Sequence, residues 1–142
     1  FDSSITIDFC TISGMGAVNI IDILCKSSNK IKNIIVCPNN NENLIRLFAY
    51  NNFYRIKKDF TIKENGFLYP IIWLNKEEGI KPKKRKKYLI CGNKKNKKED
   101  TLYLEYLENK ISQLESIPNL KEKNREKYKD LCIFRKELKK WK

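Results

Sequence analysis

Residues 8–17 read Asp8-Phe9-Cys10-Thr11-Ile12-Ser13-Gly14-Met15-Gly16-Ala17, and this stretch decides the fold of the chain. The pattern predicts an apolar strand, best placed at residues 7–12, which ends at Gly14 and Gly16. An apolar helix that runs to about Lys26 is predicted after these glycines. A buried strand that feeds a helix through a glycine turn is the repeating unit of α/β sheets. Ligands of such sheets bind at the carboxyl ends of the strands, where glycine allows close approach of the backbone. A lone Gly-x-Gly also fits a simple tight turn, so both interpretations stay open.

The next elements repeat the alternation of strand and helix. Residues 31–37 are apolar almost throughout, which predicts a strand covered on both faces, as in a parallel sheet. Pro38 ends this strand. The asparagines at 39–41 predict a loop that supplies the N-cap of a helix ending near Asn51.

A β-hairpin is expected next. Residues 53–62 and 67–74 predict two strands, and Glu64-Asn65-Gly66 between them predicts a tight turn, because Asn-Gly readily takes positive φ angles. The order strand, helix, strand, helix, hairpin indicates an α/β fold.

A basic boundary and a helical tail complete the chain. Residues 88–92 form a short apolar island within the boundary, which we expect to pin it back to the sheet. From Glu99 onward, two narrow apolar stripes at helical spacing predict an antiparallel, coiled-coil-like helical hairpin with a bend at residues 117–119. The expected organisation is an α/β part at 1–76, a basic linker at 77–98 and a helical tail at 99–142.

The basic charge of the chain is concentrated in one segment. The formal net charge is +13, and residues 81–98 hold ten basic side chains and no acidic one. Such an excess favours a polyanionic partner, although a solvated linker explains it as well. The candidates for phosphate contact are Lys81, Lys83, Lys84, Arg85, Lys86, Lys87, Lys94, Lys95, Lys97 and Lys98.

The residue inventory excludes several kinds of site. The chain has five cysteines, none in Cys-x-x-Cys spacing, and no histidine, so we expect no metal site and no Ser-His or Cys-His catalytic pair. Most of the cysteines have apolar neighbours in the sequence, which predicts small buried hydrophobes in a reducing compartment. No apolar run reaches the roughly 20 residues of a membrane span, so we expect no membrane partner. The expected state is a cytoplasmic monomer.

The order of these features resembles the bacterial tRNA (adenine(22)-N1)-methyltransferase family. The matching features are the Gly-Met-Gly loop after Asp8, the strand at 34–39 ending in Pro-Asn, the hairpin segment at 64–69 ending in Tyr, and the helix opening at 103–117. The resemblance implies the second half of a class I, Rossmann-like methyltransferase sheet followed by the helical hairpin. The chain begins at Phe1, almost inside a strand, so we expect the half that carries the cofactor loop to be absent. A transit peptide in that half would make the protein organellar.

The resemblance also implies a set of functional residues. Ser13, Gly14, Met15 and Gly16 would lie where related enzymes hold the target base beside S-adenosylmethionine, and Asn39 would orient an adenine edge. Gly14, Met15 and Asp8 would contact this cofactor.

Three of these residues also have a structural interpretation. Met15 could fill space under the sheet, Asn39 could cap a helix, and a regular strand would place Asp8 at the far end from the site.

Three positions depart from the family pattern. Ser13 stands where many members have Ala, and Ala17 replaces a frequent third Gly. Pro70 follows Tyr69 at a position where members usually carry an acidic residue, which puts catalysis in doubt if that residue matters.

The function implied by the resemblance is S-adenosylmethionine-dependent methylation of an adenine N1 in tRNA, performed as part of a longer chain. The alternative is a methyltransferase-like module without activity that serves as an RNA-binding or ribonucleoprotein component.

Overall fold

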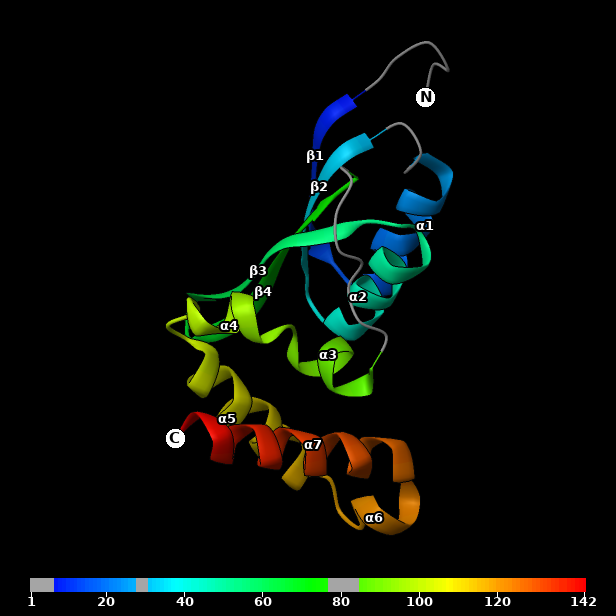
Figure 1. Cartoon of the computed structure of the whole chain (residues 1–142). Coiled ribbons are helices and arrows are strands. Elements are labelled where there is room, and N and C mark those ends of the chain that lie inside the picture. The colour runs from blue at the N-terminus through cyan, green and yellow to red at the C-terminus, as the bar shows by residue number, and fades with distance from the viewer. Residues whose placement is uncertain (1–6, 28–30, 77–84) are drawn as a thin grey trace.

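The computed structural model describes residues 7–27, 31–76 and 85–142, and its centre is one twisted sheet (Figure 1). The first two strands along the sheet are parallel and the other two pairs are antiparallel. The sheet order is β1-β2-β4-β3, with bounds β1 Ile7–Met15, β2 Ile31–Pro38, β4 Phe67–Asn75 and β3 Arg55–Glu64.

Helices α1 (Ala17–Ser27) and α2 (Glu42–Asn51) pack on one face of the sheet. Their apolar sides meet alternate residues of the strands, as the period-2 pattern of a strand requires. The α/β order expected from the sequence is confirmed. The main core consists of Ala17, Ile20, Leu24, Ile31, Ile34, Val36, Ile45, Phe48, Ala49, Tyr54, Ile72 and Leu74.

Two strand boundaries differ from those expected. β1 continues through Gly14 to Met15, because a bulge absorbs the glycine instead of ending the strand. β3 begins at Arg55, since Phe53 has a φ of 60° that a strand does not accommodate. The turn predicted between the last two strands is confirmed, with positive φ at Asn65 and Gly66.

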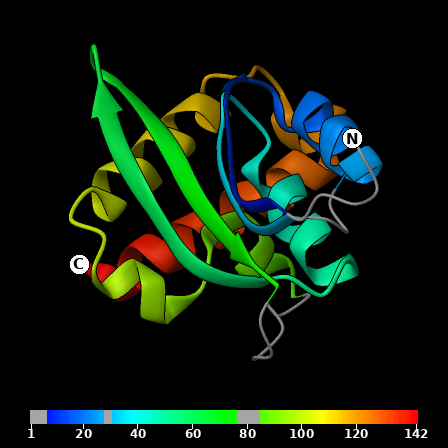
Figure 2. The same cartoon turned by 90° about the horizontal axis from the view of Figure 1, so that it is seen from above.

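The C-terminal part is a helical hairpin, as expected. Helices α5 (Tyr103–Glu115) and α7 (Arg125–Trp141) lie side by side, with the short helix α6 (Leu120–Lys123) at their turn (Figure 1). Supercoiling of α5 and α7 stays a prediction. Seen from above, the β3–β4 hairpin diverges from β1 and β2 and passes over α5 (Figure 2). None of the helices in the described ranges is long and apolar enough to cross a membrane.

The segment predicted as a linker is folded over its described part, which corrects that expectation. Two short helices, α3 (Lys86–Cys91) and α4 (Lys94–Lys98), connect the sheet to the tail. Ile90 and Cys91 of the apolar island are buried in the aromatic core of the tail, a cluster that Leu68 of β4 also joins from the sheet. The island thus fixes the tail to the body of the protein.

A buried cluster of charges holds these parts together. Arg46 of α2 donates from Nε to Asp59 Oδ2 of β3 at 2.8 Å, and its Nη1 donates to the backbone oxygen of Leu89 at 2.7 Å. Lys97 Nζ lies 3.1 Å from Asp59 Oδ1 and 3.4 Å from Asp100 Oδ2. Burial alone would raise the pKa of Asp59, but Arg46 and Lys97 outweigh it and hold that pKa below its ordinary value.

Gly92 follows α3 at the edge of this cluster, where no other residue fits. Its φ is +81°, and a Cβ atom there would lie 2.7 Å from Lys97 Cε and 2.9 Å from Asp59 Oδ2. The chain therefore needs glycine at this position both for its backbone angle and for the approach of the two charged side chains.

We predict that Asp59→Ala lowers the free energy of unfolding by about 3–5 kcal/mol, because it leaves Arg46 and Lys97 buried without their shared carboxylate. Urea denaturation followed by circular dichroism measures the change. Glu99→Ala is the control, since it breaks an exposed pair with Lys58 and should cost no more than about 1 kcal/mol. Equal losses in the two variants would show that the cluster does not stabilise the fold.

Candidate functional site

The carboxyl ends of β1 and β2 meet, as the sequence predicts for parallel strands. Ser13 pairs with Cys37 and Met15 pairs with Pro38, so Gly14 is an extra residue in a bulge, with a φ of 78°. The backbone N–H of Asn39 donates to the oxygen of Met15 at 3.0 Å. The glycine loop and the Pro-Asn strand end are thus joined directly.

The two glycines of this loop have different roles. A Cβ atom on Gly16 would lie 2.9 Å from Asn40 Oδ1, and this amide oxygen accepts the backbone N–H of Ala17 at 3.4 Å. Gly16 therefore makes room for Asn40 at the start of α1. A Cβ atom on Gly14 would have nothing within 4 Å, so Gly14 faces open space. Of the two, Gly14 is the one that leaves room for a ligand.

The asparagine loop supplies the N-cap residue of α2, as predicted from the sequence. This residue is Asn41, which lies in the left-handed region with φ 51°, and its side chain makes no cap hydrogen bond. The side chain of Asn40 reaches across to α1, where it accepts the backbone N–H of Ala17. The loop therefore also serves the neighbouring helix.

A hollow of ≈ 390 Å³ opens beside this loop, where β2 and β4 separate. The two strands pair only as far as Val36 and Ile72, so the outer half of β4 leaves β2. The hairpin, the asparagine loop and α5 enclose the resulting space. Its lining residues are Asn39, Asn40, Glu42, Phe67, Leu68, Tyr69, Pro70, Tyr106, Asn109, Lys110 and Gln113.

Glu42 lies at the base of this hollow, where it ties α5 to α2. The Tyr106 hydroxyl donates to Glu42, and Lys110 Nζ lies 3.0 Å from its Oε1. Burial alone would raise the pKa of Glu42, but Lys110, Arg46 and the hydrogen bond from Tyr106 hold it below its ordinary value. Glu42 is therefore a carboxylate at neutral pH, and it fixes the wall that α5 contributes.

The residues predicted around the glycine loop differ in exposure and in location. Ser13 and Gly14 are exposed, whereas Met15 is half-buried and packs against the main core, as its structural interpretation requires. Asn39 and Tyr69 line the same hollow. Asp8 is exposed near the other end of β1, about 20 Å along the strand from Gly14. The structure therefore does not bring Asp8 to the glycine loop, and its contact with a cofactor stays a prediction.

Several of the ten predicted phosphate-binding residues are committed to other partners. Lys97 is 2% exposed inside the ion cluster, which corrects its prediction. Lys86 pairs with Glu126 at 2.6 Å and Asp130 at 3.1 Å, and Lys87 pairs with Glu137 at 3.2 Å, all on α7.

The remaining basic residues divide into two groups. Arg85, Lys94, Lys95 and Lys98 are exposed and stay candidates. Lys81, Lys83 and Lys84 lie outside the described residues.

Sequence reasoning missed the contribution of the tail to the hollow. Asn109 and Lys110 lie three and four positions after Tyr106 along α5, and Gln113 lies four and three positions after them, which places the four residues on one face of the helix. This polar face beside the apolar stripe was the available signal. The described residues contain no group of three or more His, Cys, Asp or Glu side chains arranged to hold a metal ion.

Comparison with known proteins identifies a family and several relatives. The sequence model of a family described as tRNA (adenine(22)-N(1))-methyltransferase matches residues 2–141. A Mycoplasma pneumoniae protein with the provisional name of tRNA methyltransferase is 26% identical over 81 residues, which cover 57% of this chain and 38% of that protein.

Solved structures show the same fold. TrmK of M. capricolum, in complex with its natural cofactor product S-adenosyl-homocysteine, is 30% identical with a TM-score of 0.77, and the match covers 98% of this chain and 63% of that one. A Streptococcus agalactiae protein of the NADB-Rossmann superfamily is 25% identical with a TM-score of 0.76, over 97% of this chain and 63% of that one. The chain thus spans less than two thirds of the length of these relatives.

We predict that the two loop glycines respond differently to alanine. Gly16→Ala should displace the side chain of Asn40 and shift the NMR amide signals of residues 39–41, because the new Cβ atom would lie only 2.9 Å from the amide oxygen of Asn40. Gly14→Ala should cost about 1 kcal/mol of stability through its positive φ and leave those signals near their original positions. If the signals stay in place in Gly16→Ala, the contact between Gly16 and Asn40 does not fix the loop.

Proposed function

Because this chain belongs to the tRNA (adenine(22)-N(1))-methyltransferase family, we propose that the whole protein transfers a methyl group from S-adenosylmethionine to N1 of an adenine in tRNA. The observation that carries the proposal is that Asn39 and Tyr69 line one hollow, while the backbone N–H of Asn39 is hydrogen-bonded to the oxygen of Met15 in the glycine loop. This hollow opens at the carboxyl ends of the parallel strands, where ligands of α/β sheets bind.

The reaction is a displacement at a carbon atom. The lone pair of adenine N1 forms a bond to the methyl carbon while the carbon–sulfur bond breaks, so the positive charge passes from the sulfonium to the methylated base. The nucleophile needs no deprotonation, and positioning is the main requirement. A chain without histidine can meet it.

The hollow provides what positioning the base requires. A base that is stacked inside an RNA helix is inaccessible to the enzyme. The adenine must therefore leave its stack and enter the space between the β3–β4 hairpin and the asparagine loop. The Asn39 amide has donors and an acceptor that match adenine N6 and N7, and such a contact leaves N1 free. The ring of Tyr69, which lines the hollow, would support the base, and the open space at Gly14 would admit the methyl group.

The described residues account for binding of the target base, but they do not form a complete site for S-adenosylmethionine. Glycine backbone lies at the strand ends, but Asp8, the acidic residue predicted to contact this cofactor, is at the other end of β1. M. capricolum TrmK binds S-adenosyl-homocysteine, and this chain spans 63% of that protein. We propose that the methyl donor is held mainly by a part corresponding to the remaining length.

The tRNA contacts, the cellular compartment and the oligomeric state of the protein are also proposals. Exposed Arg85, Lys94, Lys95 and Lys98 support binding of tRNA phosphates. All five cysteines are unpaired, which supports the reducing conditions of the cytoplasm. We propose that the protein acts there as a monomer.

In the whole protein, Gly14→Val should abolish methylation and change tRNA affinity by less than about twofold, because the branched side chain fills the space needed within about 3–3.5 Å of the methyl carbon. Asn39→Ala should reduce turnover less, since it removes one orienting contact.

Mass spectrometry of N1-methyladenine in a tRNA transcript measures turnover, filter binding measures affinity, and circular dichroism controls for folding. Normal turnover by a folded Gly14→Val variant would remove this loop from the site. Binding without methylation by the unmodified protein would favour the RNA-binding alternative.

A further inference from the structure

A second hollow, of ≈ 240 Å³, adjoins the hollow at the strand ends. The two hollows share Glu42, Lys110 and Gln113 as lining residues, so they meet along α5. The walls of the second hollow are α2, α3, α5 and α7 with the residues that flank them, and none of its described lining residues belongs to a strand. Its shape is therefore set by the helices of this chain and depends on neither face of the sheet.

The second hollow has an apolar floor and a polar rim. Ile90 and Phe134 line it and belong to the buried core of the tail, against which Leu114 also packs. Asn43 of α2 and Gln113 of α5 are less buried and contribute amide groups, which can both donate and accept hydrogen bonds. This combination suits a flat ring system that carries polar groups at its edge, as a nucleobase does.

The charged residues of this hollow leave one cation available. Lys110 Nζ pairs with Glu42 at 3.0 Å, and Asp130 Oδ1 pairs with Lys86 Nζ at 3.1 Å, so both carboxylates that line the hollow are balanced. Lys127 of α7 also lines it, is exposed, and has no acidic partner within residues 7–27, 31–76 and 85–142. An exposed lysine of this kind can bind a phosphate group.

We propose that the second hollow binds the nucleotide that adjoins the target adenine on the same RNA strand. Its base would lie on the floor at Leu114 and Phe134, and Lys127 would contact a phosphate of the strand. A strand whose adenine occupies the first hollow must leave it past a wall, and the second hollow continues the space along α5. An acidic peptide would be attracted by Lys127, but it has no base for the apolar floor. The inference rests on the proposed function for the position of the target adenine.

The first test asks whether the second hollow is accessible and whether RNA occupies it. The whole protein is treated with an acetylating reagent, with and without a short uridine oligonucleotide that contains one central adenine, and mass spectrometry locates the modified lysines. Lys127 should react in the absence of RNA and be protected in its presence. A Lys127 that fails to react without RNA, or that is protected equally well by polyglutamate, would overturn the proposal.

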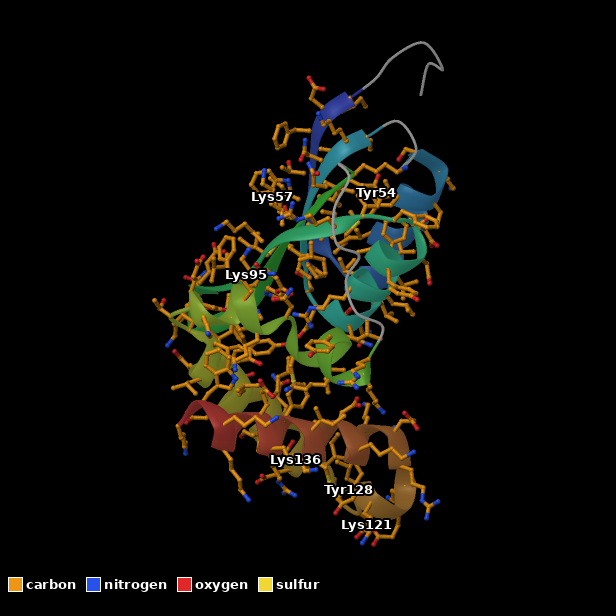
Figure 3. The ribbon with its side chains drawn as sticks, in the orientation of Figure 1. Tyr54, Lys57, Lys95, Lys121, Tyr128 and Lys136 are labelled. Carbon is orange, nitrogen blue, oxygen red and sulfur yellow. The ribbon has the colours of Figure 1, made fainter. Side chains whose placement is uncertain are left out.

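The second test compares two lysines of the same helix. Lys136 is also exposed on α7 (Figure 3), nine positions after Lys127, which places it on the opposite side of a helix with 3.6 residues per turn. Binding of the oligonucleotide is measured by fluorescence anisotropy at several salt concentrations. Lys127→Gln should lower the salt slope by about 0.7, the value for one phosphate of a single strand, and Lys136→Gln should leave it unchanged. Equal effects of the two variants would overturn the proposal.

The third test concerns the base of the neighbouring nucleotide. An abasic nucleotide on one side of the adenine should weaken binding by about fivefold or more, and one on the other side should have less effect. Asn43→Trp fills the second hollow without touching the first, which Asn43 does not line. This variant, checked for folding by circular dichroism, should bind the intact and the abasic oligonucleotides equally. Full affinity of the unmodified protein for both abasic oligonucleotides would overturn the proposal, as would undiminished discrimination by Asn43→Trp.

These assays contain no methyl donor, so they do not depend on catalysis. A whole protein in which RNA protects Lys127 but is never methylated would contradict the proposed function and support binding of RNA in this hollow. A protein that methylates tRNA normally, while Lys127→Gln binds RNA with an unchanged salt slope, would have the opposite meaning.

Discussion

The buried ion pair between Arg46 and Asp59 is the constraint on which the rest of the structure depends. It joins helix α2 to strand β3, and through Lys97 and Asp100 it extends to the segment that leads into α5. Thr61 completes the network by donating to Asp100 Oδ2 at 2.8 Å. Buried charges are costly unless every member is paired, so the cluster exists only when all of these elements are in place. It makes the helical tail a fixed part of the fold.

The hollow at the strand ends follows from that constraint. Two of its walls, the hairpin and the asparagine loop, belong to the α/β part, and the third is the polar face of α5. The ion cluster and the link between Glu42 and Tyr106 set the distance between these walls. The arrangement explains why the tail contributes to the site: without α5, the outer half of β4 would border open solvent where it leaves β2.

The fold was largely predictable from the sequence because its patterns are local. Apolar periodicity placed the strands and helices, and the glycine loop and Pro38-Asn39 correctly indicated two strand ends that meet. Charge was a poorer guide, because a count of lysines does not show which of them are paired. Lys97 looks like its neighbours in the sequence, yet its partner Asp59 is 38 positions away. Likewise, the contacts of Lys86 and Lys87 are on α7, and the role of Tyr106 depends on Glu42, 64 positions distant. Such pairings arise from tertiary structure alone.

The ion cluster also limits how this sequence can diverge. Exposed lysines on α4, such as Lys94 and Lys95, can be exchanged for other polar residues with little effect on folding, so folding alone does not oppose drift in base composition at these positions. Lys97 cannot follow that drift, since any uncharged replacement removes the buried cation that Asp59 and Asp100 share. A change at Arg46, Asp59, Lys97 or Asp100 therefore needs a compensating change in another element, and Gly92 must remain small throughout. Within a lysine-rich segment that looks freely variable, the buried position evolves as part of the core.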